Sequence, residues 1–153
     1  MSSHGTPIDH VHHLGITVAD MDRSLDFWRR FLGVEATSRR LVDAPFLGDL
    51  VGYAGAVLEI AWVDLPSGLA LELVRYDEPV EPPLAIGSAH PGAVHVCIGV
   101  DDLPTALRHA IDAGATQASL EPVVIPAGPN LGARHVYVRD PDGVSIELRQ
   151  APA

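Results

Sequence analysis

Apolar and polar residues alternate along two short stretches of the chain, about 11–18 and 94–100, and this alternation predicts a β-strand in each. After each of these stretches in the sequence, apolar residues recur every three or four positions, up to Gly33 in the first half and up to Gly114 in the second. An aspartate suited to capping a helix precedes each of these segments: Asp20 or Asp22, then Asp101 or Asp102. Each half of the chain therefore predicts a strand followed by a helix.

Further apolar segments in each half, joined by turns that contain Gly and Pro, predict pairs of adjacent strands. They lie at about 56–63 and 69–76 in the first half, and at about 135–138 and 144–149 in the second. The Pro-rich stretch between the halves cannot easily continue a sheet, because proline lacks the backbone donor that a ladder needs. The expected organisation is one α+β domain over residues 1–153: module 1 at about 8–77, a linker at about 78–91, and module 2 at about 92–150.

Two blocks of the first half recur in the second half in the same order. Residues 13–20 align with 95–102 at a shift of 82, and His, Ile, Val and Asp coincide. Residues 63–73 align with 138–148 at a shift of 75, and Val, Pro, Gly, Glu and Leu coincide. Either block alone could be a chance likeness between strand-turn-strand segments. Together, with a loop difference of seven residues between them, they favour an internal duplication.

Four of the predicted strands carry one ligand-type side chain in mid-strand, on the face turned away from the main apolar positions. These side chains are His13, Glu72, His95 and Glu147. A carboxylate amid apolar residues is costly to bury unless it is paired or bound to a cation. Two neutral imidazoles and two carboxylates around a divalent ion carry no net charge, so the quartet predicts a metal site. The alternative is an outer sheet face where these side chains simply meet water; their repeat-equivalent positions count against it.

Charge and composition narrow the possible partners. Twenty acidic side chains against ten basic ones give a formal net charge of -10, which would repel nucleic acid and anionic membrane surfaces. No apolar run approaches the roughly 20 residues that a membrane-spanning helix needs. The lone cysteine, Cys97, excludes an internal disulfide and suits a reducing compartment. We therefore expect a cytoplasmic protein that acts on a small molecule, with no nucleic-acid or membrane partner.

Three motifs resemble the vicinal oxygen chelate superfamily, which includes glyoxalase I, methylmalonyl-CoA epimerase, extradiol dioxygenases and bleomycin- or fosfomycin-resistance proteins. They are His13-Leu14-Gly15-Ile16-x-Val18 with Asp20, the pairs Phe27-Trp28 and Leu32-Gly33, and Asp140-Pro141-Asp142-Gly143-x-x-Ile146-Glu147-Leu148. The resemblance covers about residues 8–150. It implies two tandem βαβββ modules that form a curled mixed sheet around a metal-containing cleft, commonly in a homodimer. His13, Glu72, His95 and Glu147 fall on the family's four metal positions.

The ligand set implied by the resemblance favours one kind of chemistry. A His, Glu, His, Glu quartet is similar to bacterial glyoxalase I, and it implies a divalent ion such as Ni, Co, Zn, Mn or Fe. We expect a lyase, isomerase or epimerase that chelates a small oxygenated carbonyl substrate and abstracts a proton through an enolate or enediolate. In glyoxalase-like enzymes a glutamate ligand can leave the ion and act as the base. Glu147 is the first choice for that role and Glu72 the second.

Two alternatives stay open. An Fe(II)-dependent ring-cleaving dioxygenase generally uses two histidines and one glutamate, so it is favoured only if one of the two glutamates proves not to be a ligand. A drug-binding resistance protein without catalytic activity would not need the quartet at all. Among the other polar residues, His135 and Tyr137 share one strand face and are candidates for contact with a substrate.

Overall fold

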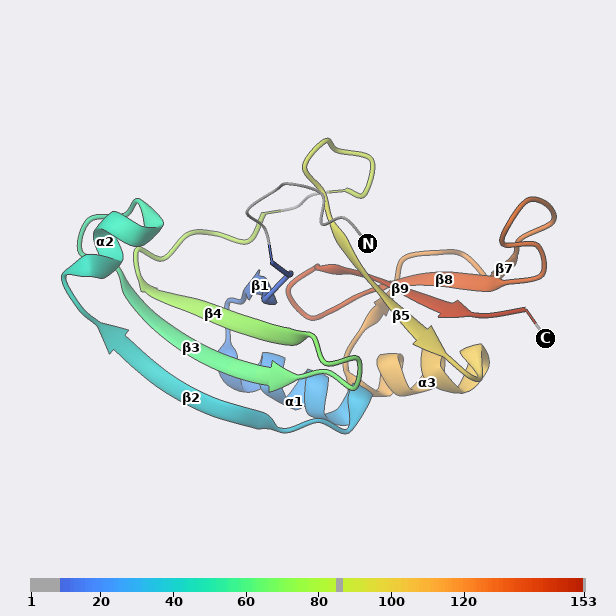
Figure 1. The fold of residues 1–153 in the computed structure, drawn as a ribbon, viewed down its shortest axis with the longest axis horizontal. Helices are drawn as coiled ribbons and strands as arrows, with labels where there is room; N and C mark the ends of the chain where they lie inside the picture. Colours follow the sequence, from blue (N-terminus) through green and yellow to red (C-terminus); the bar gives the residue numbers. More distant parts are fainter. Residues whose placement is uncertain (1–8, 85–86, 153) are drawn as a thin grey trace.

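The computed structural model describes residues 9–84 and 87–152, which form an α+β fold of two modules (Figure 1). Module 1 is a four-stranded mixed sheet with the strand order β1-β4-β3-β2, in which β1 runs parallel to β4 and the other pairs are antiparallel. Its elements are β1 (His13–Thr17), α1 (Met21–Leu32), β2 (Ala36–Asp43), α2 (Phe46–Val51), β3 (Val57–Asp64) and β4 (Ala70–Glu78).

Module 2 repeats this topology with a broken outer strand. Its sheet has the order β5-β9-β8-β6, with β5 parallel to β9, and the short β7 also pairs with β8. Its elements are β5 (His95–Val100), α3 (Leu103–Ala113), β6 (Thr116–Gln117), β7 (Val123–Val124), β8 (Arg134–Arg139) and β9 (Ser145–Gln150). Because β6 and β7 both pair with β8, together they take the position that β2 occupies against β3 in module 1.

The two modules also share the register of their parallel strand pairs. Gly15 lies opposite Glu72 across β1 and β4, and Cys97 lies opposite Glu147 across β5 and β9. These pairs are related by the same shifts of 82 and 75 residues that align the two halves of the sequence. The duplication inferred from the sequence therefore extends to the strand order and to the pairing of individual residues.

Both long helices begin and end where their capping residues predict. Asp20 accepts a hydrogen bond from the Arg23 amide at the start of α1, and Asp102 caps α3 in the same way. Each helix ends at a glycine with positive φ, which a residue without a side chain adopts most easily. The stop signals at Gly33 and Gly114 are thus confirmed.

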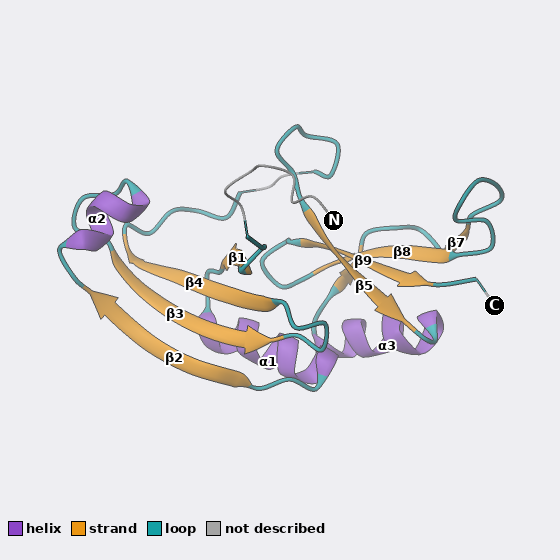
Figure 2. Ribbon diagram, viewed as in Figure 1, coloured by secondary structure: helices purple, strands orange, loops and turns teal. Residues whose placement is uncertain are grey.

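The two long helices lie along one side of the two sheets (Figure 2), contact each other, and share one core with the sheets. Fully buried side chains from both modules meet there: Trp28 and Leu73 from module 1, and Leu103, Ile146 and Leu148 from module 2. We call the opposite side of each sheet its open face. The small helix α2 covers only one end of the open face of module 1, where Leu47 packs with Ala56 and Leu58.

A turn of module 2 is hydrogen-bonded to the start of α1. The Asp142 carboxylate accepts hydrogen bonds from the Ala19 amide at 3.1 Å and from Arg23 at 2.5 Å. Its neighbour Asp140 organises the same turn by accepting from the amides of Asp142 and Val144. The modules are therefore held by an apolar helix interface and by a polar contact at one end of it.

The structure confirms the α+β class and the two modules, and it adds features that the sequence pattern did not predict. Strand β2 and helix α2 were not expected from residue periodicity. In this single chain the two mixed sheets lie next to each other and do not close into a barrel. No helix among residues 9–84 and 87–152 is long and apolar enough to cross a membrane.

Candidate functional site

The open face of module 1 carries a histidine–glutamate pair on its two parallel strands, β1 at the edge of the sheet and β4 next to it. His13 Nε2 on β1 lies 3.2 Å from Glu72 Oε2 on β4, and the two side chains are 34% and 22% exposed. Both point away from the core because they alternate with buried residues such as Ile16 and Leu71. The second ring nitrogen of His13 lies 2.8 Å from Nδ1 of His12, so the imidazole is held from both sides.

Module 2 carries the equivalent pair with the same separation. His95 Nε2 on β5 lies 3.2 Å from Glu147 Oε2 on β9, and the side chains are 47% and 14% exposed. The parallel strands β5 and β9 have the same relation as β1 and β4, so the same residue offsets bring the same two atoms together. The structure therefore brings the four predicted residues into two matching pairs.

Among the described residues, Glu147 has a further side-chain partner that Glu72 lacks. Nδ1 of His135 on β8 lies 2.6 Å from Glu147 Oε1, and the His135 side chain is only 16% exposed. Burial raises the pKa of the Glu147 carboxyl, but hydrogen bonds from His135 and Cys97 outweigh it, so the pKa is lowered overall. Burial and the nearby Glu147 charge raise the pKa of Cys97 and of Tyr137. Cys97 is therefore held as a thiol rather than activated as a nucleophile.

An aromatic ring stands edge-on to each paired histidine. Trp62 on β3 has its ring centroid 5.0 Å from that of His13, and Tyr137 on β8 lies 5.4 Å from His95. The two aromatics occupy equivalent places, directly across from Glu72 and from Glu147 in the sheet register. Tyr137 was a candidate from the sequence, whereas Trp62 was missed, although the shift of 75 residues that relates the two glutamates also relates these two rings.

The donor atoms in each module have the spacing that a shared cation requires. Two ligands about 2.1 Å from one ion, at adjacent corners of its coordination sphere, lie roughly 3.0 Å apart, close to the 3.2 Å found in both pairs. Imidazole nitrogens with carboxylate oxygens also form a donor set that suits Zn, Ni, Co, Mn or Fe. The residues thus fit a divalent metal. Within one chain, however, the described residues contain no group of three or more His, Cys, Asp or Glu side chains arranged to hold a metal ion.

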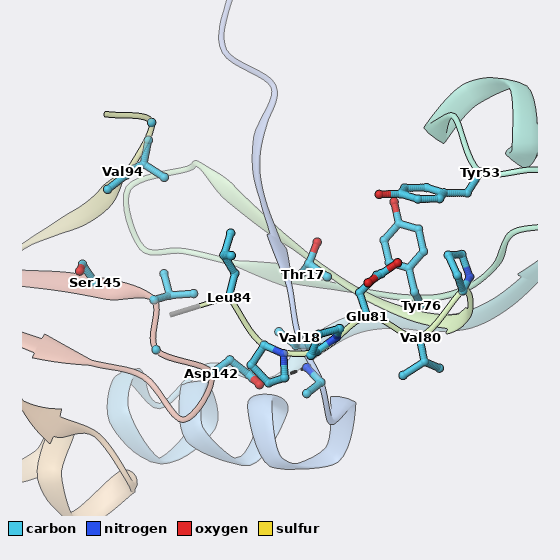
Figure 3. A pocket seen from close by; sticks show the side chains of 18 residues that line it. Thr17, Val18, Tyr53, Tyr76, Val80, Glu81, Leu84, Val94, Asp142 and Ser145 are labelled. Atoms are coloured by element: carbon cyan, nitrogen blue, oxygen red, sulfur yellow. Dashed lines mark hydrogen bonds between the residues drawn. The ribbon is translucent and has the colours of Figure 1, made fainter. Parts of the chain in front are cut away.

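A separate cavity of about 510 Å³ lies between the modules, and the linker residues Val80, Glu81 and Leu84 line part of it (Figure 3). Thr17 and Ser145 line it at the ends of strands β1 and β9, and the rings of Tyr53 and Tyr76 lie at one end. The two tyrosine rings meet edge-on, with centroids 5.9 Å apart. None of the four predicted metal ligands lines this cavity, so it is distinct from the two histidine–glutamate pairs.

These features define a class of protein: a duplicated βαβββ chain with one His–Glu pair on the open face of each half. Comparison with known sequences identifies the family. The model of the Glyoxalase/Bleomycin resistance protein/Dioxygenase superfamily matches residues 12–139, and the chain belongs to this superfamily. Members of the superfamily generally use divalent metal ions, bind small molecules and are typically dimers.

Individual relatives agree with this assignment. The chain is 30% identical over 148 residues to a 2-epi-5-epi-valiolone epimerase from an Actinomyces species, covering 94% of this chain and 80% of the relative. Among solved structures, a glyoxalase family protein from Bacillus cereus superimposes with a TM-score of 0.83 at 20% identity, covering 99% of this chain and 100% of that one. A glyoxalase I mutant from Zea mays has a TM-score of 0.64 at 19% identity, covering 92% of this chain and 45% of that chain. Membership of the superfamily and the epimerase relative suggest enzymatic activity.

Proposed function

We propose that this chain is a metal-dependent epimerase, isomerase or lyase of glyoxalase type, with His13, Glu72, His95 and Glu147 as the metal ligands. Its substrate is a small oxygenated carbonyl compound. One observation carries the proposal: the two His–Glu pairs occupy equivalent positions and have the same 3.2 Å separation, which fits adjacent ligands of one ion. The 30% identity to an epimerase favours epimerisation within this range of reactions.

The complete site in this proposal is formed between two copies of the chain. The two pairs lie on separate sheets, and a single chain does not gather them into one group among its described residues. If the open face of module 1 meets that of module 2 from a second copy, each interface would combine His13 and Glu72 with His95 and Glu147 of the partner subunit. A symmetric dimer would then contain two such sites. The dimer also buries the open faces and excludes water from the donors.

The chemistry follows from the groups on these faces. The bound cation would polarise the substrate carbonyl and stabilise the enolate charge that develops beside it. The histidines hold their positions because each ring is fixed by neighbours, His13 by His12 and Trp62, and His95 by Tyr137. A glutamate of the set takes the proton from the carbon next to the carbonyl. The aromatic rings limit how the substrate can lie over the two pairs.

The proposal is tested by metal content and by proton exchange. Protein purified without chelator is analysed for Ni, Co, Zn, Mn and Fe, reloaded with each ion, and given 2-epi-5-epi-valiolone in D₂O. We expect about one ion per chain and incorporation of deuterium next to the carbonyl, with epimerisation. His13→Ala should lose the metal, whereas His109→Ala, which removes an exposed histidine on α3, should retain it.

Each alternative function gives a different result in this test. Bound iron with uptake of oxygen, and no exchange at carbon, would instead support a dioxygenase. Failure to bind any of the five ions would overturn the metal-dependent proposal and favour a drug-binding protein. The expected compartment is a reducing one, the cytoplasm, in keeping with the single cysteine.

A further inference from the structure

The two glutamates have different surroundings although they are repeat-equivalent. Glu147 is flanked on the open face by Cys97 on β5 and Tyr137 on β8. Its Oε1 accepts a hydrogen bond from Nδ1 of His135. Its second oxygen, Oε2, is the one that faces His95. Each carboxylate oxygen of Glu147 therefore has its own imidazole partner, and the side chain is only 14% exposed.

Among the described residues, module 1 lacks two of these neighbours, the equivalents of His135 and Cys97, whereas Trp62 takes the place of Tyr137. Applying the shifts that relate the two halves, the counterpart of His135 is Ile60 and the counterpart of Cys97 is Gly15. Among the described residues, Glu72 has one polar side-chain partner, His13. A Cβ added at Gly15 would have Glu72 Oε2 as its nearest neighbour at 3.9 Å and no other atom within 4 Å. The space beside the Glu72 carboxylate is thus open.

We propose that His135 is a positioning residue that fixes Glu147 as a permanent ligand, and that Glu72 is the carboxylate that moves and takes the substrate proton. This assignment rests on the proposed function and reverses the order that the sequence motifs favoured. To leave its place, Glu147 would have to break a hydrogen bond with a mostly buried imidazole and leave that imidazole unpaired, which is costly. Within the described part of the chain, Glu72 has no such bond to break.

The proposed proton transfer needs no reactant other than the substrate and water. The bond between hydrogen and the carbon next to the carbonyl breaks, and its electron pair enters the enolate. The proton forms a new O–H bond on Glu72. Return of a proton from water to the opposite face of the same carbon gives the epimer, and Glu72 then releases its proton to solvent.

We call the contact between His135 and Glu147 the clamp, and it can be tested without metal or substrate. His135 Nε2 is buried and has no hydrogen-bond partner among the described residues, whereas Nδ1 faces the Glu147 carboxylate. The ring proton should therefore lie on Nδ1. Two-bond ¹H–¹⁵N correlation spectra of the metal-free protein identify the tautomer of each histidine. We expect the Nδ1–H form for His135 in the wild type. The Nε2–H form would overturn the clamp.

The decisive comparison uses matched substitutions in the two modules, with Co²⁺ affinity measured by titration. We expect Glu147→Gln and His135→Ile, which installs the residue of module 1, each to weaken Co²⁺ binding by about 10- to 100-fold. Glu72→Gln should weaken it less than His135→Ile does. His135→Gln, whose amide can still donate to Glu147, should restore much of the affinity and covers the case in which His135→Ile folds poorly.

Exchange of deuterium into 2-epi-5-epi-valiolone then separates binding from proton transfer. With saturating Co²⁺, Glu72→Gln should slow exchange by about 10²- to 10⁴-fold, and Glu147→Gln much less. Ile60→His, which places a clamp beside Glu72, should slow exchange while Co²⁺ affinity stays within a few-fold of wild type. Equal loss of affinity in Glu72→Gln and Glu147→Gln, or unchanged affinity in His135→Ile, would overturn this inference alone. A wild type that binds no Co²⁺ would overturn the proposed function itself.

Discussion

The contact between Arg23 and Asp142 predicts a measurable coupling between the two modules. Asp142 belongs to a turn of module 2, its side chain is 7% exposed, and its Oδ1 lies 2.5 Å from the Arg23 guanidinium on α1. Hydrogen bonds between charged groups contribute about 1.5–3 kcal/mol when well shielded. Arg23 is 46% exposed, however, so solvent screens the pair. We therefore expect a coupling of about 1 kcal/mol.

A double-mutant cycle isolates this coupling. The free energy of unfolding in urea is measured for the wild type, Arg23→Ala, Asp142→Ala and the double variant, all at one protein concentration because a dimer would make stability depend on it. The matched control is the pair Arg29 and Asp26 on the same helix, whose side chains are both 49% exposed. That exposed pair should give about 0.3–0.5 kcal/mol. A coupling for Arg23 and Asp142 no larger than the control would refute the inter-module contact.

Three further changes test the fold. Trp28→Ala removes a ring that is 0% exposed between the sheet and the helices, and it should cost about 3–5 kcal/mol of unfolding free energy in urea; a loss under about 1 kcal/mol would place that ring outside the core. Gly33→Ala should lower the free energy of unfolding by about 1 kcal/mol. The cost comes from the backbone alone, because φ is 69° there and no atom lies within 4 Å of the added methyl group. Unchanged stability would mean that residue 33 does not end α1 in the left-handed conformation. Burial raises the pKa of Asp140 although backbone hydrogen bonds oppose it, so the folded state binds the proton more tightly than the unfolded state. The contribution of Asp140 to the free energy of unfolding is therefore fully present below its pKa in the unfolded state, and it is lost as pH rises through its pKa in the folded state. Acidification from pH 7 to pH 4 should therefore favour the wild type relative to Asp140→Asn in urea unfolding, and a pH-independent difference would contradict the shift.

Much of the fold follows from local signals in the sequence. Asp20 and Gly33 predict the ends of α1 because capping depends on a few neighbouring residues. Strand β2 was missed because its residues, Ala36–Asp43, show no alternation and are mostly exposed. It is a strand because the edge of β3 supplies a partner for its backbone, which is a tertiary interaction. Helix α2 has only six residues, too few for a clear helical period.

For the candidate site, the sequence predicted which residues share a face within each sheet. A period of two residues fixed the shared face of His13 and Glu72, and the duplicated motifs extended this to His95 and Glu147. Periodicity along a strand carries no information about how two sheets face each other, so the sequence could not distinguish a site within one chain from one between copies. The contact of His135 with Glu147 was likewise hidden, because it depends on cross-strand side-chain geometry.

The joining of both pairs around one ion can be tested by complementation. One variant carries His13→Ala with Glu72→Ala, the other carries His95→Ala with Glu147→Ala, and each alone should bind no Co²⁺. After co-expression, random pairing makes about half of the dimers mixed, and each mixed dimer has one complete site of two. We therefore expect about 0.25 Co²⁺ per chain in the mixture. No recovery of binding in the mixture, although the wild type binds Co²⁺ and mixed dimers are present, would contradict it.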